Sequence, residues 1–159
     1  MGDEQHARGA TISETSAPLI SRFCYRIGAH TLLLEATLTA EVLTTQTIHA
    51  LPFAPDWCAG LVSLRGDLFP VMDMHKVVLG KPAPHQTQLL LIQHPQFSPI
   101  ILTCDGFPRQ LKLSDADLTE YTPENLPSWI PHTLQHNGQT LLAADHGRLL
   151  RQIRQTTNR

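Results

Sequence analysis

Histidine, aspartate and cysteine are the residue types in this chain that could do acid–base or metal chemistry, and there are nine histidines. His132 and His136 stand four positions apart, a spacing that would place both imidazoles on one face of a helix. Pro131 precedes the pair and Asn137-Gly138 follows it, so we expect an extended segment. In an extended segment these two side chains lie too far apart to hold one ion without other ligands. We therefore predict solvated or half-buried histidines and no metal site.

Asp73 and His75 could act as a base and the group that orients it. Asp73 directly follows an apolar run, however, where a short carboxylate caps the turn that comes next. The three cysteines are widely separated and form no C-x-x-C element, which predicts buried, reduced thiols. Because the chain has no nucleophile elbow, no phosphate-binding glycine loop and no paired-carboxylate arrangement, we predict no catalytic residue.

Arg65 is the candidate for recognition of another protein. It stands in Arg65-Gly66-Asp67, a tight turn between two apolar runs, where the glycine holds the guanidinium at the tip. A planar group with five N–H donors suits bidentate or stacking contacts with a partner. The Arg-Gly-Asp tripeptide itself is too short to indicate cell adhesion.

Composition excludes several other classes of function. The net charge of -2 and the absence of a basic stripe give no reason to expect nucleic-acid binding. The aliphatic runs are far shorter than the ~20 residues that a membrane-spanning helix needs. No apolar core of a secretory signal follows Met1. We therefore expect a cytoplasmic protein with no direct membrane insertion.

The elements that position Arg65 lie within residues 51–80, the part of the chain in which turn-forming residues are most dense. Pro52 and Pro55 force extended geometry on the residues before them, and one helical turn is expected to start at Pro55. Apolar runs on both sides of Arg65 predict a hairpin. Its returning strand is apolar on both faces, which predicts cover on both sides, and Pro70 predicts an edge or a bulge there.

In most of the remaining chain, short apolar runs bounded by turn residues predict short strands and turns. A hairpin is expected around Gly28-Ala29, and two aliphatic strands on either side of residues 94–99. We also expect a short helix in residues 38–42, a strand over residues 44–52, a turn at Asp105-Gly106, and a surface loop in residues 111–131 with one helical turn at 114–118. Short helices are predicted before the capping residue Gly80 and from His146 onward, and a hairpin at Asn137-Gly138.

The two halves of the chain share a pattern. A shift of 72 positions places Gly66 on Gly138 and Asp73 on Asp145, and also Lys76 on Arg148. Few identities survive, but the order of turn glycine, apolar strand, aspartate, basic residue and aliphatic pair is kept. This is the pattern expected of two related small barrels in one chain.

The motifs of the first half resemble the signature of CheW-like domains, the coupling proteins of bacterial chemosensory arrays. The matching positions are Pro52, Pro55, Gly60, Leu64, Arg65, Gly66, Pro70, Val71 and Asp73. The resemblance implies an all-β fold of two intertwined, five-stranded SH3-like barrels around a shared apolar layer, with short helices at the corners. The expected domain, with its two barrel subdomains, covers residues 19–154. The polar residues 1–18 predict a disordered arm, and residues 155–159 a flexible end.

The resemblance also implies a function, that of a noncatalytic adaptor without a cofactor. Such an adaptor joins the cytoplasmic tip of a chemoreceptor, a methyl-accepting chemotaxis protein, to the regulatory domain of a CheA-type histidine kinase. In this family the arginine that matches Arg65 lies at the surface that meets the receptor's hairpin tip. The implied partner-binding residues are Arg65, Glu41, Val42 and Gly60. Gly66 and Gly138 are expected to be structural turn residues.

The pathway and two rival functions stay open at this point. The divergent second half, the many histidines and Thr39, where the family has an aliphatic residue, point to the PilI-like branch of type IV pilus twitching motility. The first rival is a small metal-binding or enzymatic barrel that uses His132, His136, Asp73 or Asp145. The second is a ligand-binding barrel with a closed apolar cavity of about 300 Å³ or more.

Overall fold

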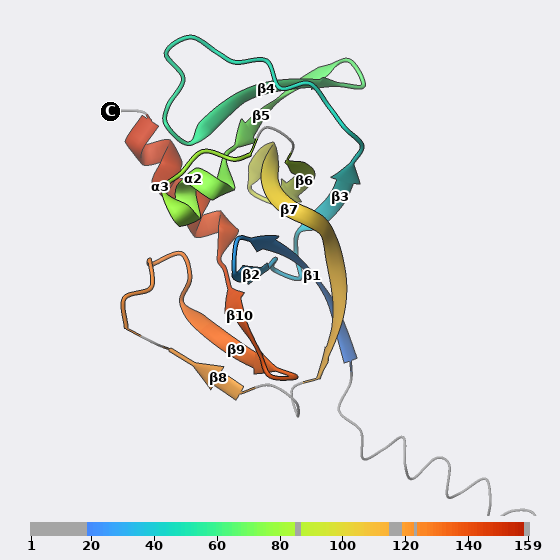
Figure 1. Ribbon diagram of the computed structural model, residues 1–159, viewed down its shortest axis with the longest axis vertical. Helices are drawn as coiled ribbons and strands as arrows, with labels where there is room; N and C mark the ends of the chain where they lie inside the picture. Colours follow the sequence, from blue (N-terminus) through green and yellow to red (C-terminus); the bar gives the residue numbers. More distant parts are fainter. Residues whose placement is uncertain (1–18, 85–86, 115–118, 123, 158–159) are drawn as a thin grey trace, which may run out of the picture.

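Strands dominate the structure, a computed structural model that describes residues 19–84, 87–114, 119–122 and 124–157 (Figure 1). The strands are β1 (Leu19–Ile27), β2 (His30–Leu33), β3 (Thr39–Leu43), β4 (Cys58–Leu64), β5 (Asp67–Met72), β6 (Gln88–His94), β7 (Phe97–Ser114), β8 (Thr119–Tyr121), β9 (His132–His136) and β10 (Gln139–Ala143). The helices are α2 (Met74–Leu79) and α3 (His146–Thr157). The arm expected over residues 1–18 lies outside the described residues, and α3 continues past the expected domain end at residue 154.

The 18-residue strand β7 joins two groups of strands. Its first part pairs with β6 and, in parallel, with β5, which also pairs with β4; β3 lies on the other side of β6. Its second part pairs with β1, and the order continues through β2, β10, β9 and β8. Figure 1 shows β7 passing from the upper group of strands to the lower one. The prediction of an all-β fold with short helices is confirmed. Among the described residues the first group has the expected five strands, and the second has six because β7 belongs to both.

Three apolar clusters explain why the strands are hydrophobic on both faces. Neighbouring residues of one strand point to opposite sides of the sheet, so Leu89 and Leu91 belong to the cluster inside the first group, while Leu90 and Ile92 face the largest cluster between the groups. The cluster inside the second group contains Cys24, Leu33, Leu113, Leu134, Leu141 and Ala143. The two groups of strands therefore share one apolar layer, and each group also encloses an apolar core between its own strands.

The hairpin predicted around Arg65 is present as β4 and β5. Leu64 pairs with Asp67, which leaves a two-residue loop. Val71 and Met72 are fully buried on opposite faces, as expected for a strand with cover on both sides. Pairing of β5 with β7 begins at Val71, so the ring of Pro70 lies just before the stretch where a backbone N–H would be needed.

The internal repeat is visible in the backbone. Asp73 N–H donates to the Trp57 carbonyl at 2.7 Å, and Asp145 N–H donates to Trp129 at the same distance. Each aspartate then caps the following helix: Asp73 Oδ1 accepts from Lys76 N at 3.0 Å, and Asp145 Oδ1 from Arg148 N at 2.9 Å. The turn residues correspond as well, because Arg65-Gly66 and Asn137-Gly138 both have two positive φ angles. Two related units therefore make up the chain.

Several local predictions were wrong. Residues 39–43 form the edge strand β3 and no helix, and residues 44–52 contain one bridge, His49 to Leu61, and no strand. Residues 55–58 form a turn closed by a hydrogen bond from Cys58 N–H to the Pro55 carbonyl, and no helix. Asp105-Gly106 is no chain reversal: β7 continues through it, with a register shift against β1. The loop expected over residues 111–131 contains β8, and most of the helical turn expected at residues 114–118 lies outside the described residues.

Candidate protein-docking site

The β4–β5 hairpin holds Arg65 in one backbone geometry. Arg65 has φ 53° and Gly66 has φ 84°, the two positive values of a hairpin turn whose twist matches that of the flanking strands. A non-glycine residue at positive φ is uncommon and marks a position that the surrounding structure fixes. The side chain therefore leaves the tip of the hairpin in a defined direction.

That direction leads to Glu41 on the edge strand β3. Arg65 Nη1 donates to Glu41 Oε1 at 3.2 Å, and Nη2 donates to Oε2. Both side chains are exposed, at 65% for Arg65 and 45% for Glu41. The hydrogen bond from Arg65 lowers the pKa of the Glu41 carboxyl, and the same contact raises the pKa of the guanidinium. The pair links the hairpin tip to β3 and still presents charge to solvent.

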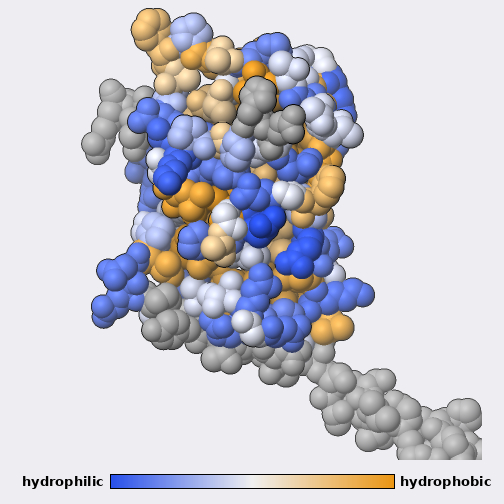
Figure 2. All heavy atoms as spheres, in the orientation of Figure 1, coloured by the Kyte–Doolittle hydropathy of each residue, from blue (hydrophilic) through white to orange (hydrophobic). Residues whose placement is uncertain are grey.

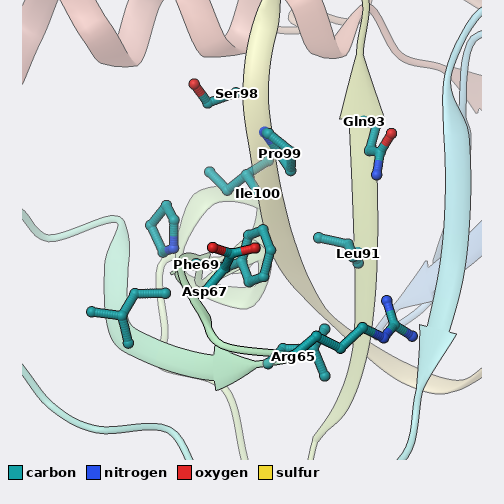
Figure 3. A pocket seen from close by; sticks show the side chains of 11 residues that line it. Arg65, Asp67, Phe69, Leu91, Gln93, Ser98, Pro99 and Ile100 are labelled. Carbon is teal, nitrogen blue, oxygen red and sulfur yellow. The ribbon is translucent and has the colours of Figure 1, made fainter.

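An open groove of about 590 Å³ begins beside this ion pair (Figure 3). Figure 3 shows the Arg65 side chain extending from the hairpin past Leu91 of β6 toward β3. The groove lies between the hairpin and the strands β6 and β7. Its apolar lining consists of Leu64, Leu68, Phe69, Pro70, Leu91, Pro99 and Ile100. We call it the hairpin groove.

Leu68 is the most exposed apolar residue of the hairpin groove, at 66%. Figure 2 shows that polar side chains cover most of the visible face and that apolar ones gather in small separate patches. Arginine is enriched in protein interfaces relative to the rest of the surface, and so are aromatic side chains such as that of Phe69 in the lining. The hairpin groove is therefore suited to accept apolar side chains of a partner next to a charged contact.

The structure brings together two of the four expected partner-binding residues. Glu41 pairs across the sheet with Leu91, which lines the hairpin groove, and its carboxylate bonds Arg65 beside that groove. Val42 is exposed at 37%, but as the next residue of the same strand it points to the opposite face.

Gly60 is buried and has φ 144°. A Cβ there would stand 2.3 Å from the carbonyl oxygen of His49. Because Gly60 has no Cβ, the segment before β4 can pass close to that strand.

Sequence reasoning missed the part of the groove that β6 and β7 contribute. Gln93, Ser98 and Ile100 are distant from Arg65 in the chain and reach the groove through strand pairing. Leu68 could have been found, because it is a large apolar residue one step past the turn. Phe53 was also missed: it is fully exposed and has φ 61°, a conformation that non-glycine residues rarely adopt.

The acid–base residues form a structural network around His75. Its Nδ1 lies 2.9 Å from Thr103 Oγ1, and its Nε2 lies 2.8 Å from Asp105 Oδ1. Thr103 accepts the N–H of Met74 at 3.0 Å and is fully buried. The order hydroxyl, imidazole, carboxylate is that of a nucleophilic triad, but here the hydroxyl is fully buried and holds the backbone at the start of α2.

Asp105 also accepts the N–H of Gly28 at 2.7 Å. Burial would raise the pKa of Asp105, but this hydrogen bond and the one with His75 outweigh it, so the pKa is lowered. The capping interpretation of Asp73 is confirmed, because its Oδ2 accepts from Ala83 N at 3.0 Å in addition to the contact with Lys76.

A second buried network connects α3 to the second group of strands. His146 Nδ1 lies 2.7 Å from Glu35 Oε1, and its Nε2 lies 2.7 Å from the Tyr25 hydroxyl oxygen. Glu35 Oε2 also accepts the N–H of His146 at 2.9 Å. Burial would raise the pKa of Glu35, but the contacts with His146 and the N–H of Gly147 outweigh it and lower the pKa. Burial raises the pKa of Tyr25 well above its usual value.

The metal hypothesis finds no support in the described residues. His132 and His136 lie on β9, an extended segment, and are half-buried. Asp145 caps α3. Across the described ranges, no group of three or more His, Cys, Asp or Glu side chains could hold a metal ion. Among the same residues no helix is both long and apolar enough to span a membrane.

Comparisons with known proteins agree with the fold. A family model described as the CheW-like domain matches residues 22–154. A crystal structure of the scaffolding protein TtCheW from Thermoanaerobacter tengcongensis is similar, with a TM-score of 0.63 and 13% sequence identity over 82% of this chain and 89% of that one. At this identity the likeness concerns the fold alone. No curated protein matches the sequence.

Proposed function

Because the chain belongs to the CheW-like domain family, we propose that it is a noncatalytic adaptor that couples chemoreceptors to a CheA-type histidine kinase. Its receptor partner is the cytoplasmic tip of a methyl-accepting chemotaxis protein, and its kinase partner is the regulatory domain. The observation that carries the receptor half of the proposal is the exposed Arg65–Glu41 pair at the hairpin groove. That the similar TtCheW is a scaffolding protein supports a coupling role in general.

Receptor docking uses the groove and the ion pair together. Apolar side chains from the receptor's helical hairpin enter the hairpin groove and remove Leu68 from water, which supplies affinity. Arg65 supplies specificity, since its fork of N–H donors bonds a carboxylate or carbonyl oxygen only in the correct orientation. Arginine is also among the residues most often found at energetic centres of interfaces.

Glu41 prepares Arg65 for this contact. Its two contacts with the guanidinium restrict the rotamers of a long side chain before the receptor arrives. Less conformational entropy is then lost on docking. Val42, on the other face of β3, extends the docking surface around the edge strand, and Gly60 supports it by allowing the close approach of the preceding segment.

The kinase binds the ends of the barrels, and the two partners communicate through the shared apolar layer. Strands of the first group and helix α3 of the second both pack into this layer, so a shift imposed at one surface changes packing at the other. In this role the protein resides in the cytoplasm beside membrane-anchored receptor arrays. The system is either chemotaxis or, as in the PilI-like branch, type IV pilus twitching motility.

The proposal is tested by capture with purified fragments. Receptor tips from the host's chemotaxis and pilus systems, and the kinase regulatory domain, are immobilised separately. We expect Arg65→Ala to lose receptor capture while its melting temperature stays that of the parent, because both side chains of the ion pair are exposed. Lys112→Ala, which removes an exposed cation from β7, is the matched control and should retain capture.

A charge swap separates an internal role of the ion pair from contact with the receptor. The double variant Arg65→Glu, Glu41→Arg restores the pair in reverse. Capture should remain lost, because the guanidinium then leaves from β3 instead of the hairpin. Full capture by the swapped protein, or a strongly lowered melting temperature of Arg65→Ala, would show that Arg65 is structural. Absence of capture by any receptor tip would refute the adaptor function.

A further inference from the structure

Helix α3 presents a row of cations that the proposed receptor site does not use. Arg148, Arg151 and Arg154 follow one another at intervals of three residues, all are exposed, and the helix has no acidic residue. Residues three apart are neighbours on a helix surface, about 4.5 Å apart along its axis. Figure 1 shows α3 running past α2 toward the C terminus.

The guanidinium groups of these three arginines differ in how many partners they have within the protein. Arg148 donates to the Ser128 carbonyl at 2.6 Å and lies 3.8 Å from Asp145. Arg154 stacks over the Phe97 ring at 4.6 Å from its centroid. The side chain of Arg151 is exposed and makes no hydrogen bond or ion pair with any residue of the described ranges. Within the described part of the chain, the end of the row nearest the C terminus is therefore cationic without a carboxylate partner.

An apolar groove of about 370 Å³ lies directly beside this end of the helix, between α3 and the start of β7. Its lining includes Trp57, Phe97, Ile100, Leu150, Ile153 and Arg154. We call it the α3 groove. Phe97 and Ile153 are half-buried and line a recess instead of projecting from the surface. The stacked Arg154 forms part of the wall, so a cation is held in place at the edge of an apolar recess.

We propose that the α3 groove binds an acidic amphipathic helix of a partner protein. The partner places apolar side chains in the recess and aligns its carboxylates with Arg151 and Arg154. Carboxylates three or four residues apart on such a helix repeat at about 4.5–6 Å, which matches the spacing of the arginines. The α3 groove does not include Arg65, although Ser98 and Ile100 line both it and the hairpin groove. A helix docked in the α3 groove is therefore a contact in addition to the proposed receptor docking.

A helix fits this surface better than a membrane or a nucleic acid does. Membrane binding needs apolar side chains that project from a basic face, whereas those of the α3 groove are recessed. A nucleic-acid site needs a wider basic surface than one helix provides, and the net charge of the chain is -2. A helix docked in a groove uses both features present here, an apolar recess and charges along its border.

Fluorescence anisotropy with a synthetic helix tests the proposal. The probe is a labelled peptide of about 18 residues with leucines on one face and glutamates beside them, and its control carries glutamine at every glutamate position. We expect the glutamate peptide to bind the full chain in a saturable and salt-sensitive way. The variant with Arg151→Glu and Arg154→Glu should bind it about tenfold more weakly. Lys112→Glu, a charge reversal on β7, and Arg65→Ala should bind it as the parent does.

A second measurement places the peptide in the groove. Trp57 lines it, so its emission should change when the glutamate peptide is added, and Trp57→Phe should abolish the change. Equal binding of the glutamate and glutamine peptides, no saturable binding, or the same affinity for the arginine variant would overturn the proposal. So would arginine-dependent sedimentation with phosphatidylglycerol vesicles in the absence of peptide binding. Because Arg65→Ala is inert here, these failures are distinct from a failure of receptor docking.

Discussion

Replacing Gly60 with alanine tests whether this residue acts through the fold or through direct contact with a partner. The new Cβ would stand 2.3 Å from the His49 carbonyl oxygen, a distance that forces the segment before β4 to move. That movement breaks the two hydrogen bonds between His49 and Leu61, at 2.8 and 2.9 Å. Each contributes about 1 kcal/mol, and strain of an alanine at φ 144° adds about 1–3 kcal/mol. We expect the free energy of unfolding to fall by about 3–5 kcal/mol.

Gly66→Ala is the matched control. Gly66 also has a positive φ, 84°, but nothing lies within 4 Å of a Cβ built there. Its alanine variant should therefore pay only the backbone cost of a left-handed residue, about 1–2 kcal/mol. The comparison isolates the steric contact, because both substitutions add one methyl group at positive φ.

Urea unfolding followed by tryptophan fluorescence measures both variants, and equal slopes against denaturant would confirm a common transition. For a chain of this size, about 3–5 kcal/mol corresponds to a melting temperature lowered by roughly 6–20 °C. If Gly60→Ala is no less stable than Gly66→Ala, the reasoning from the close approach is wrong. If it is also folded and loses receptor capture, Gly60 contacts the partner directly.

Two further predictions concern buried ionisable groups. The lowered pKa of Glu35 means that its contribution to stability is present above the unfolded value of about 4.5 and is lost as pH falls through the lower folded value. The urea midpoint should therefore fall more steeply below pH 4.5 in the parent than in Glu35→Gln, and parallel curves would contradict this. Burial raises the pKa of Cys104 to about 12, whereas Cys58 is only half-buried. Iodoacetamide at pH 8 should then modify Cys58 first in the native protein, as peptide mass spectrometry would show, and early labelling of Cys104 would contradict its burial.

The features that sequence analysis predicted correctly are local. The turns at Arg65-Gly66 and Asn137-Gly138 depend on residues that tolerate positive φ, and the cap at Asp73 depends on a short carboxylate before a helix. Each of these signals lies within a few residues of the structure that it specifies. The hairpin and the following helix could therefore be predicted without the rest of the chain.

The errors arose where distant segments decide the structure. Residues 39–43 become a strand because β6 offers them five paired positions, which outweighs a weak local helix signal. In β7, the residues up to Cys104 pair with β6, and those from Asp105 onward pair with β1. Because both partners keep the chain extended, Asp105-Gly106, a dipeptide that usually reverses the chain, becomes a bulge. The hairpin groove was only partly predictable for the same reason, since β6 and β7 supply five of its eleven lining residues.

The internal repeat separates what the turn at Arg65 requires of its residue from what Arg65 adds to it. Arg65 and Asn137 occupy equivalent turns with nearly the same φ, 53° and 51°, and the aspartate caps that follow are equivalent too. The backbone thus requires a residue that accepts positive φ at both turns, and asparagine does so at lower steric cost than arginine. The arginine in the first unit is therefore not explained by turn geometry alone. Arginine forms the ion pair with Glu41 beside the hairpin groove, which asparagine could not form, and the receptor docking that we propose would use this guanidinium.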